Sequence, residues 1–427
     1  WLRGETRMLE YKANRAFRKC LHVMLTAFLC LVALLLLGWA CLLKDPHLLP
    51  LRPIETPLIL LLCLVLAILA RGLRHARLRV CLPVLLLLVV AFTLYQEADF
   101  QHVRATVLTT PTSLHMQING RMIVGFTDFD EAAQLAENGV AGLFLSARNV
   151  QGRSFDELKN WIEQLQRVRL QNGLPPLHIA SDQEGGVVSR LSPLLPRQPP
   201  LSHLLGLHNS KQAAFRYGLE KGRKMAELGV DVNFSPVVDL KPDGPSSPLD
   251  FHTRISTRAI SSAPAQVIEL ASAYVDGLRQ GGVTATLKHF PGLARVSEDT
   301  HHFAARLRTP VKELLKSDWL PFLQLGRDGL TWVMLSHVIL QDVDPDRPVS
   351  TSRKVVDELL RNDLGFEGRL VTDDMTMGAT YYRGFCLSII EAYETSIDYI
   401  LISYDPDKYF DAVACLSIYM QKQRSIR

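Results

Sequence analysis

The chain has little cysteine, and most of it lies in one region. Five of its seven cysteines fall in or beside apolar stretches before residue 100, which leaves only Cys386 and Cys415 for the rest of the 427-residue sequence. Their spacing fits neither a metal-binding motif nor a disulfide framework, so we expect them to act as small apolar packing residues. Cysteine usage therefore does not indicate the compartment.

An excess of positive charge is also missing from most of the chain. Residues 1–104 hold 13 Lys and Arg against 6 Asp and Glu, whereas the remainder holds 34 against 37. The slightly acidic balance after residue 104 argues against a nucleic-acid-binding surface there. The basic residues of the first segment are better explained as the solvated flanks of membrane spans.

Three runs near the N-terminus contain no Lys, Arg, Asp or Glu, and they cover residues 20–43, 56–70 and 80–96. The first, with 24 residues, exceeds the roughly 20 residues that cross a bilayer core. The other two span only about 22 to 26 Å as helices and need snorkelling flanks. We expect residues 1–104 to form an all-α transmembrane anchor of about three helices in a lipid bilayer.

The basic residues also predict an orientation for this anchor. They precede the first run and fill the loop between the second and third runs: Arg3, Arg7, Lys12, Arg15, Arg18, Lys19, Arg71, Arg74, Arg77 and Arg79. The positive-inside rule then places the N-terminus in the cytoplasm and the chain after residue 104 on the periplasmic or exterior side of the cell membrane. A cleaved signal peptide is disfavoured because the first run is too long. A transporter is disfavoured because His22 is the single ionisable residue in the runs.

Short apolar runs alternate with amphipathic stretches over residues 105–427, which is typical of repeated βα units. Eight of these units predict an α/β chain folded as a (β/α)8 TIM barrel, with its active site at the carboxyl ends of the strands. The expected strands are Arg121–Phe126, Val140–Ser146, His178–Asp182, Val230–Val238, Ala285–His289, Trp332–Ser336, Arg369–Asp373 and Asp398–Ser403. The expected helices are 154–170, 212–228, 265–280, 310–326, 351–363 and 406–423.

Two segments of this barrel carry most of the chemistry. Lys288-His289-Phe290-Pro291-Gly292 is followed by Asp299-Thr300-His301, and a buried strand later ends in Asp373-Asp374. A carboxylate at a strand end and a histidine with a neighbouring carboxylate could cleave a glycosidic bond through a covalent intermediate. The carboxylate orients the imidazole, which can then exchange protons near neutral pH.

Together with four further segments, these motifs resemble glycoside hydrolase family 3, in particular its single-domain β-N-acetylglucosaminidases. The further segments, in order, are Ser181-Asp182-Gln183-Glu184-Gly185-Gly186 with Arg190, residues 231–239, Arg258 ahead of Ser262-Ala263-Pro264, and Ser336-His337-Val338. The resemblance covers the chain from about Leu114 onward. It leaves no sequence for the second, sandwich-like domain that many larger relatives append.

The resemblance implies a role for each motif residue. Asp373, rather than Asp374, is the expected nucleophile, with His301 as general acid and base and Asp299 as its partner. Structural alternatives are a helix cap for Asp373 and buried ion pairs for the charged residues. His337 is expected either to line the pocket or only to bond backbone. The residues expected to bind the sugar are Asp182, Arg190, Arg258, Lys288, His289 and His337.

The implied activity is exo-hydrolysis of terminal β-linked N-acetylglucosamine, with peptidoglycan fragments as the natural context, and without a metal or other cofactor. One departure is Leu293-Ala294, where relatives commonly have His-Gly. It bears on the flexibility of the loop before the Asp299–His301 pair, the dyad. Two alternatives remain open. One is a phosphorylase using the same dyad, because a histidine does not repel phosphate, and the other is a non-catalytic glycan-binding membrane protein.

Overall fold

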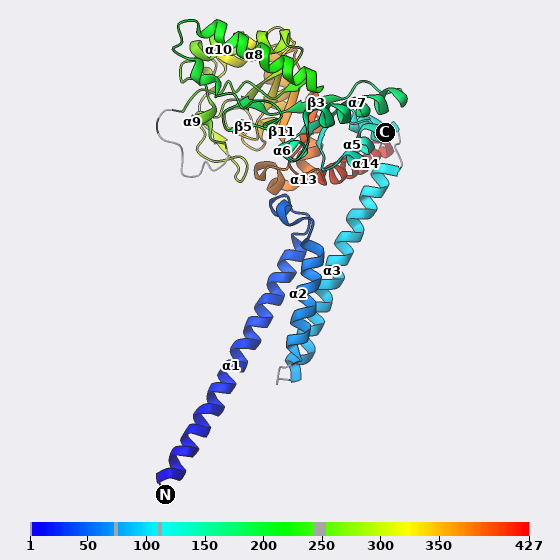
Figure 1. Ribbon diagram of the computed structural model, residues 1–427, viewed down its shortest axis with the longest axis vertical. Coiled ribbons are helices and arrows are strands. Elements are labelled where there is room, and N and C mark those ends of the chain that lie inside the picture. The colour runs from blue at the N-terminus through cyan, green and yellow to red at the C-terminus, as the bar shows by residue number, and fades with distance from the viewer. Residues whose placement is uncertain (1, 72–75, 110–112, 243, 245–252, 427) are drawn as a thin grey trace. The chain divides into compact units, whose positions relative to one another are not determined.

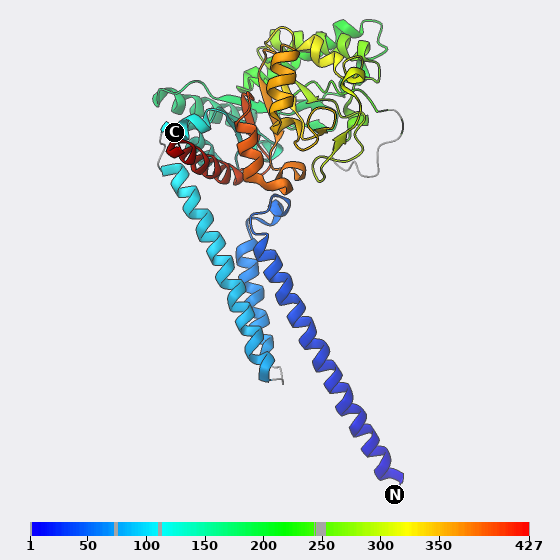
Figure 2. The same cartoon turned by 180° about the vertical axis from the view of Figure 1, so that it is seen from behind.

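The structure is a computed structural model that describes residues 2–71, 76–109, 113–242, 244 and 253–426. The chain divides into two compact units, residues 1–106 and residues 107–427. Among the described residues, the regular elements of the first unit are helices, and the strands lie in the second unit (Figure 1 and Figure 2).

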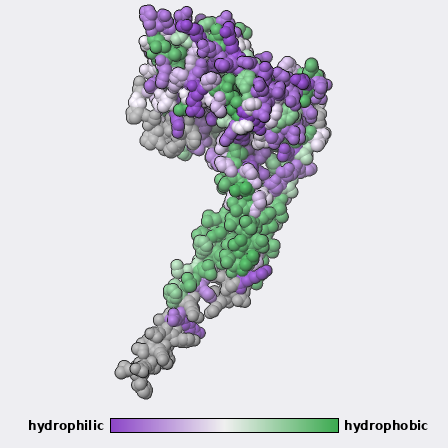
Figure 3. Space-filling model, viewed as in Figure 1, coloured by the Kyte–Doolittle hydropathy of each residue, from purple (hydrophilic) through white to green (hydrophobic). Residues whose placement is uncertain are grey.

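The first unit consists of long apolar helices. Its elements are α1 Leu2–Cys41, the short helix η1 Pro46–Leu51, α2 Glu55–Ala70 and α3 Ala76–Thr109. The part of these helices that is coloured in Figure 3 is mostly hydrophobic, whereas the barrel surface in the same view is mostly hydrophilic. By length and composition, Asn14–Cys41 and Val80–Thr109 are long enough to cross a membrane, and Glu55–Ala70 is a shorter apolar helix.

Charged side chains gather where α1, α2 and α3 meet the chain around η1. Lys44 lies 3.1 Å from Glu97 of α3, and Arg52 lies 3.3 Å from Glu55 at the start of α2. Thr56 also donates to Glu97. Pairing of this kind offsets part of the cost of removing these charges from water. These contacts link the chain that follows α1 to the start of α2 and to α3.

The second unit is built on a closed barrel of eight parallel strands. Each barrel strand pairs with the barrel strands that precede and follow it in the chain, and the last barrel strand pairs with the first. The predicted (β/α)8 barrel is confirmed, and each of the eight strands overlaps its predicted range, although the fourth, predicted as Val230–Val238, covers only Val232–Asn233. They are β1 Met122–Gly125, β2 Gly142–Leu145, β3 His178–Ser181, β6 Val232–Asn233, β7 Thr284–Phe290, β9 Trp332–Leu335, β11 Leu370–Asp374 and β12 Tyr399–Ile402.

Helices connect these strands around the outside of the barrel (Figure 1). They are α4 Ser113–Asn119, α5 Phe129–Glu137, α6 Ala147–Val150, α7 Phe155–Gln171, η2 Leu201–Leu204, α8 Ser210–Leu228, α9 Ile255–Arg258, α10 Pro264–Gln280, α11 Val311–Leu314, α12 Leu320–Leu325, η3 Val349–Thr351, η4 Lys354–Asp363, α13 Gly378–Tyr393 and α14 Lys408–Ile426. Two small sheets lie in the connections, β4 Gln183–Gly185 with β5 Val188–Ser189, and β8 Arg306–Leu307 with β10 Ile339–Leu340.

The barrel interior is filled by side chains from the strands. Phe144 stacks on Phe234 with ring centroids 5.8 Å apart, and Trp332 stacks on Tyr399 at 4.8 Å. Apolar residues complete the core: Ile123, Ala180, Val232, Met334, Val371 and Leu401. The barrel is therefore a packed core rather than a pore, and its chemistry is confined to the rims.

One predicted helix is wrong in its length. Residues 310–326 form two short helices, α11 and α12, instead of one. Pro321 lies in the first turn of α12, where its missing N–H costs nothing, so a new helix begins there. The break places Asp318 and Trp319 in the interior.

The expectation for the two late cysteines is also wrong, because Cys386 and Cys415 form a disulfide. Cys386 lies on α13 and Cys415 on α14, and their Cα atoms are 5.6 Å apart, within the usual range for a bridge. The two helices pack against each other across the last strand connection, a contact between residues 29 positions apart that spacing alone does not reveal.

Candidate active site

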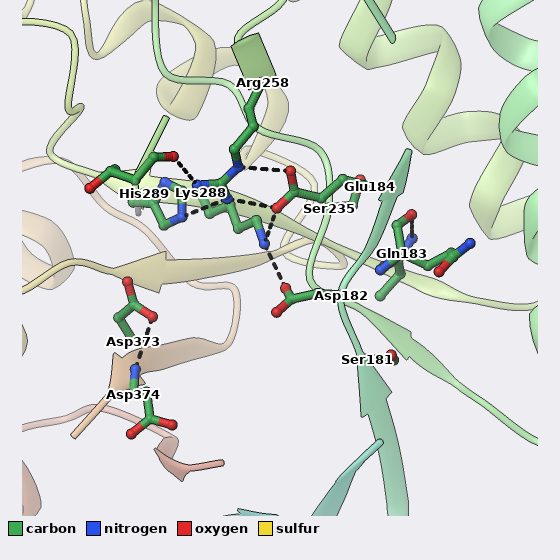
Figure 4. A network of polar contacts seen from close by, with 12 residues as sticks. Ser181, Asp182, Gln183, Glu184, Ser235, Arg258, Lys288, His289, Asp373 and Asp374 are labelled. Carbon is green, nitrogen blue, oxygen red and sulfur yellow. Dashed lines mark hydrogen bonds and ion pairs between the residues drawn. The ribbon is translucent and has the colours of Figure 1, made fainter. Parts of the chain in front are cut away.

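The predicted site residues gather at one rim of the barrel because parallel strands end at the same edge. Asp182 directly follows β3, Lys288 and His289 lie near the end of β7, and Asp373 lies near the end of β11. Figure 4 shows these side chains converging from separate strands. Residues more than 100 positions apart therefore meet in one place.

Four charged side chains form a network there. The Lys288 Nζ atom lies 2.6 Å from Asp182 Oδ1 and 2.7 Å from Glu184 Oε1. Arg258 donates to both oxygens of Glu184, at 2.6 and 2.9 Å. This fork-to-fork geometry fixes the direction of the guanidinium as well as its distance. Glu184 thus holds Lys288 and Arg258 side by side.

Burial and pairing act against each other on these groups. Burial alone would lower the pKa of Lys288, but the carboxylates of Asp182 and Glu184 outweigh it and raise this pKa. Burial would likewise raise the pKa of Glu184, but Arg258 and Lys288 hold it well below its usual range. Lys288 is 2% exposed and Asp182 22% exposed. Asp182 is therefore the more exposed member of the pair.

A second pair extends the network toward residues 291–305, the loop that carries Asp299 and His301 and is called the dyad loop below. Asp239, which is fully buried, accepts from the Nδ1 atom and the backbone N–H of His289. Its other oxygen accepts from the N–H of Leu293 at 2.9 Å. The far side of the His289 ring lies 3.3 Å from Arg258. Asp239 therefore orients His289 and holds the start of the dyad loop with one carboxylate.

The Leu293 side chain is 5% exposed, so the departure from His-Gly places an apolar residue in the interior. The loop is held at this point through its backbone, and the missing polar side chain is not needed for that contact.

The two neighbouring aspartates of β11 differ sharply. The Asp374 carboxylate accepts from the N–H and hydroxyl of Thr376, from the N–H and hydroxyl of Ser403, and from the N–H of Tyr404. Asp373 accepts from the Asp374 N–H at 2.9 Å, and in Figure 4 the two side chains point in different directions. Asp374 is thus committed to structural bonds.

Electrostatics and burial act against each other on Asp373. Burial alone would raise its pKa, but the electrostatic influence of nearby histidines, His289 foremost, and the Asp374 N–H hold this pKa below its usual range. Asp373 therefore stays ionised at neutral pH, as a nucleophile must.

His337 is completely buried behind this strand end. Its Nδ1 atom lies 2.7 Å from the Ser350 hydroxyl, and its Nε2 atom lies 2.8 Å from the Asp374 carbonyl. Burial lowers the pKa of His337 and so favours the neutral ring. Both nitrogens have protein partners, so the position supports the Asp373-Asp374 strand end.

The Asp299 and His301 side chains form the predicted pair. Their Oδ1 and Nδ1 atoms are 2.7 Å apart, and Asp299 also accepts from the His301 N–H and from Thr253. Asp299 is fully buried, whereas His301 is 40% exposed. Because the same aspartate oxygen holds both the ring and the backbone of the histidine, the imidazole is fixed with its opposite nitrogen directed away from Asp299.

Arg190 does not join the network through its side chain. Its backbone N–H donates to the Asp182 carbonyl at 3.0 Å, and its side chain is exposed. The exposed guanidinium is available at the rim beside Asp182.

Three contributors were not among the predicted site residues: Glu184, Asp239 and Thr253. Glu184 stands two positions after Asp182, a spacing that places both side chains on one side of an extended segment. Asp239 lies in the motif of residues 231–239, for which the resemblance implied no role. Thr253, whose carbonyl also accepts from Arg258, carries no sequence signal.

Within the described residues, no group of three or more His, Cys, Asp or Glu side chains is arranged to hold a metal ion.

Comparison with known proteins places this geometry in context. The profile described as "Glycosyl hydrolase family 3 N terminal domain" matches residues 117–422. A β-hexosaminidase of Nitrosomonas eutropha is 34% identical over 288 residues, which are 65% of this chain and 77% of that protein.

Two solved structures share the barrel. One is a glycoside hydrolase family 3 β-N-acetylglucosaminidase from Paenibacillus, with a TM-score of 0.67 and 28% identity over 73% of this chain and 59% of that longer one. The other is NagZ from Neisseria gonorrhoeae in complex with N-trifluoroacetyl-D-glucosamine, with a TM-score of 0.59 and 28% identity over 69% of this chain and 84% of that one.

Proposed function

The chain belongs to glycoside hydrolase family 3, and from this membership we propose that it is a β-N-acetylhexosaminidase-type enzyme that releases terminal β-linked N-acetylglucosamine. The observation that carries the proposal is a carboxylate and a histidine–carboxylate pair at one rim: the pKa of Asp373 is held below its usual range, and Asp299 Oδ1 lies 2.7 Å from His301 Nδ1. Relatives named as β-hexosaminidase, and the NagZ structure with its bound glucosamine derivative, support the choice of sugar.

The proposed reaction has two displacement steps. In the first, an Asp373 oxygen attacks C1 of the sugar, the bond from C1 to the leaving oxygen breaks, and His301 gives that oxygen its proton. In the second, His301 takes a proton from water, the water oxygen attacks C1, and the Asp373 carboxylate leaves. The product keeps the β configuration, and His301 ends in its starting protonation state.

The other residues are proposed to bind the sugar before these steps. Asp182 and Lys288 form a charged pair that can accept from and donate to neighbouring hydroxyls, and His289 adds a polar ring edge. Arg258 lies behind them, paired with Glu184. The exposed Arg190 can contact groups at the rim, whereas His337 is proposed to act through the Asp374 carbonyl.

We also propose that residues 1–104 anchor the enzyme in the cell membrane as a multi-pass segment, with the barrel on the periplasmic or exterior side. The apolar helices and the placement of the basic residues support the anchor and its orientation. The Cys386–Cys415 disulfide supports the same side independently, because disulfides persist in oxidising compartments. Peptidoglycan or its fragments would then be the accessible substrate.

The test of the activity is turnover of nitrophenyl glycosides by the full-length protein. We expect release of nitrophenol from N-acetyl-β-glucosaminide, little from β-glucoside, and a free sugar as the product. Sugar 1-phosphate formed when phosphate is added would instead identify a phosphorylase. Binding of N-acetylglucosamine without turnover would identify a glycan-binding protein, and both outcomes would overturn the proposal.

A further inference from the structure

The loop that carries the dyad is bound directly to the helix that follows the nucleophile. The Gly378 N–H, at the start of α13, donates to the His301 carbonyl at 2.8 Å, and the Ala379 N–H donates to the Thr300 carbonyl at 3.2 Å. The first N–H groups of a helix have no partner within that helix. Here the backbone of the dyad loop supplies the partners.

This contact leaves no room for a side chain. A Cβ atom on Gly378 would lie 2.9 Å from the His301 carbonyl oxygen and 2.8 Å from that of His302. Both are backbone atoms, so relief would require the loop or the helix start to move rather than a side chain to rotate. Glycine is needed at this position for space.

A short, fixed turn joins this contact to Asp373. The Met377 N–H donates to the Asp374 carbonyl at 3.1 Å, and the Met375 N–H donates to Leu401 of β12 at 2.9 Å. The Asp374 carboxylate adds bonds to Thr376 within the same turn. The loop carrying His301 is therefore docked on the segment that carries Asp373.

We propose that Gly378 is a positioning residue that sets the distance between His301 and Asp373 by allowing the dyad loop to dock on α13. The inference rests on the proposed roles of these two residues. Asp239 and Asp318 also hold the loop, but before the dyad, and Thr253 holds the Asp299 side chain, whereas the bonds to α13 hold the backbone of Thr300 and His301. Displacing the loop at Gly378 thus moves the proton donor away from the reaction while the nucleophile stays in place.

The test is Gly378→Ala in the full-length protein, assayed on two N-acetyl-β-glucosaminides. With a sugar as leaving group, which needs a proton, we expect kcat/KM to fall about 30- to 100-fold, whereas with 2,4-dinitrophenol, which does not, it should fall less than about 5-fold. Azide should speed the second step of Gly378→Ala with the dinitrophenyl substrate. Azide forms a bond to C1 as the Asp373 carboxylate leaves, and it needs no base to remove a proton.

Gly368→Ala is the matched control. A Cβ there would lie 2.7 Å from the Thr331 carbonyl oxygen, a similar backbone clash just before the same strand but at the opposite end of the barrel. It should lower the melting temperature without changing the ratio of the two rates or creating a response to azide. A Gly378→Ala variant that slows both substrates equally and ignores azide would contradict the positioning role.

A double-mutant cycle and a measurement without substrate complete the test. Adding Gly378→Ala to His301→Ala should cost little more than His301→Ala alone, and multiplied losses would contradict the proposal. Hydrogen exchange at residues 299–305 should be faster in Gly378→Ala than in Gly368→Ala, and equal exchange would contradict docking. An inactive wild-type protein would overturn the proposed function, whereas the exchange result would still decide the docking.

Discussion

The barrel has a histidine–aspartate pair at each end. At the carboxyl end, His301 Nδ1 lies 2.7 Å from Asp299, and at the amino end, His178 Nδ1 lies 2.7 Å from Asp231. The two histidines are similarly exposed, at 40% and 34%. The carboxylates differ, because Asp299 is fully buried and Asp231 is 45% exposed.

Their surroundings differ more than their geometry. His178 packs against Trp332 and Tyr399, and the Tyr399 hydroxyl lies 3.3 Å from its second ring nitrogen. His301 instead lies near enough to Asp373 to lower the pKa of that carboxyl. A histidine–aspartate pair is therefore not a catalytic device by itself. Its function depends on whether it lies beside a group that can react with the substrate.

The largest expected effect is at the carboxyl end. Asp373→Asn should reduce turnover on the order of 10⁴-fold or more, because no neighbour replaces the nucleophile. Asp374→Asn should instead lower stability, since its carboxylate accepts from Thr376, Ser403 and Tyr404. Steady-state rates and melting temperatures of the two variants check this. Full activity in Asp373→Asn would end the proposed assignment.

The next largest expected difference is between alanine variants of the two histidines. His301→Ala should reduce turnover of a poor leaving group about 10²- to 10⁴-fold, with a much smaller loss on dinitrophenol. His178→Ala should change activity less than about 3-fold and should mainly lower stability, because it removes the ring contacts with Trp332 and Tyr399. Parallel kinetics on the same substrates compare the ends directly, and similar losses in both variants would remove the distinction drawn between them.

Buried charge provides a third comparison. Glu184→Ala leaves Lys288 and Arg258 without their shared carboxylate, and breaking such a buried pair costs about 3 to 5 kcal/mol. Asp231→Ala removes a half-exposed partner and should cost about 1 kcal/mol or less. Urea denaturation gives both values. Equal costs would show that the carboxyl-end network is not the more stabilising one.

The last expected effect is a dependence of stability on pH. Lys221 of α8 donates to the Glu184 carbonyl at 2.7 Å, and burial lowers its pKa to about 7. An unfolded lysine has a pKa of about 10.4, so between these values the unfolded state binds more protons and the free energy of unfolding rises with pH. Below pH 7 this contribution is constant.

Lys221→Met should remove that rise, which is on the order of 3 to 5 kcal/mol over the whole window. Melting curves of both proteins from pH 6 to 10 measure it. Parallel curves for the variant and the wild type would show that Lys221 keeps its proton throughout.

The sequence predicts the barrel well because each strand is a short apolar run with a regular spacing to the next. It also predicts which residues share the rim, since Asp182, Lys288, His289 and Asp373 each lie at or beside a strand end. The partners of these residues are harder to predict from the sequence. Arg258 and Glu184 are 74 positions apart, and the bond between them depends on how two connections fold over the rim.

The same reason explains the remaining differences. The disulfide joins two helices whose packing is set by the last strands, and the break before Pro321 is stabilised by burial of Trp319, which donates to the Pro291 carbonyl. Local sequence carries neither contact. In the helical unit, the uncharged run marks only the apolar part of a helix, and α3 continues to Thr109 through polar residues.

The most direct test of the account is to trap the covalent intermediate. The full-length enzyme would be inactivated with a 5-fluoro analogue of an N-acetylglucosaminyl fluoride, because C2 of this sugar carries the acetamido group, and digested for mass spectrometry. The account predicts one labelled peptide containing residues 368–377, with the sugar on Asp373 and none in Asp373→Asn. A label on Asp374 or on another carboxylate, or inactivation without any label, would contradict it.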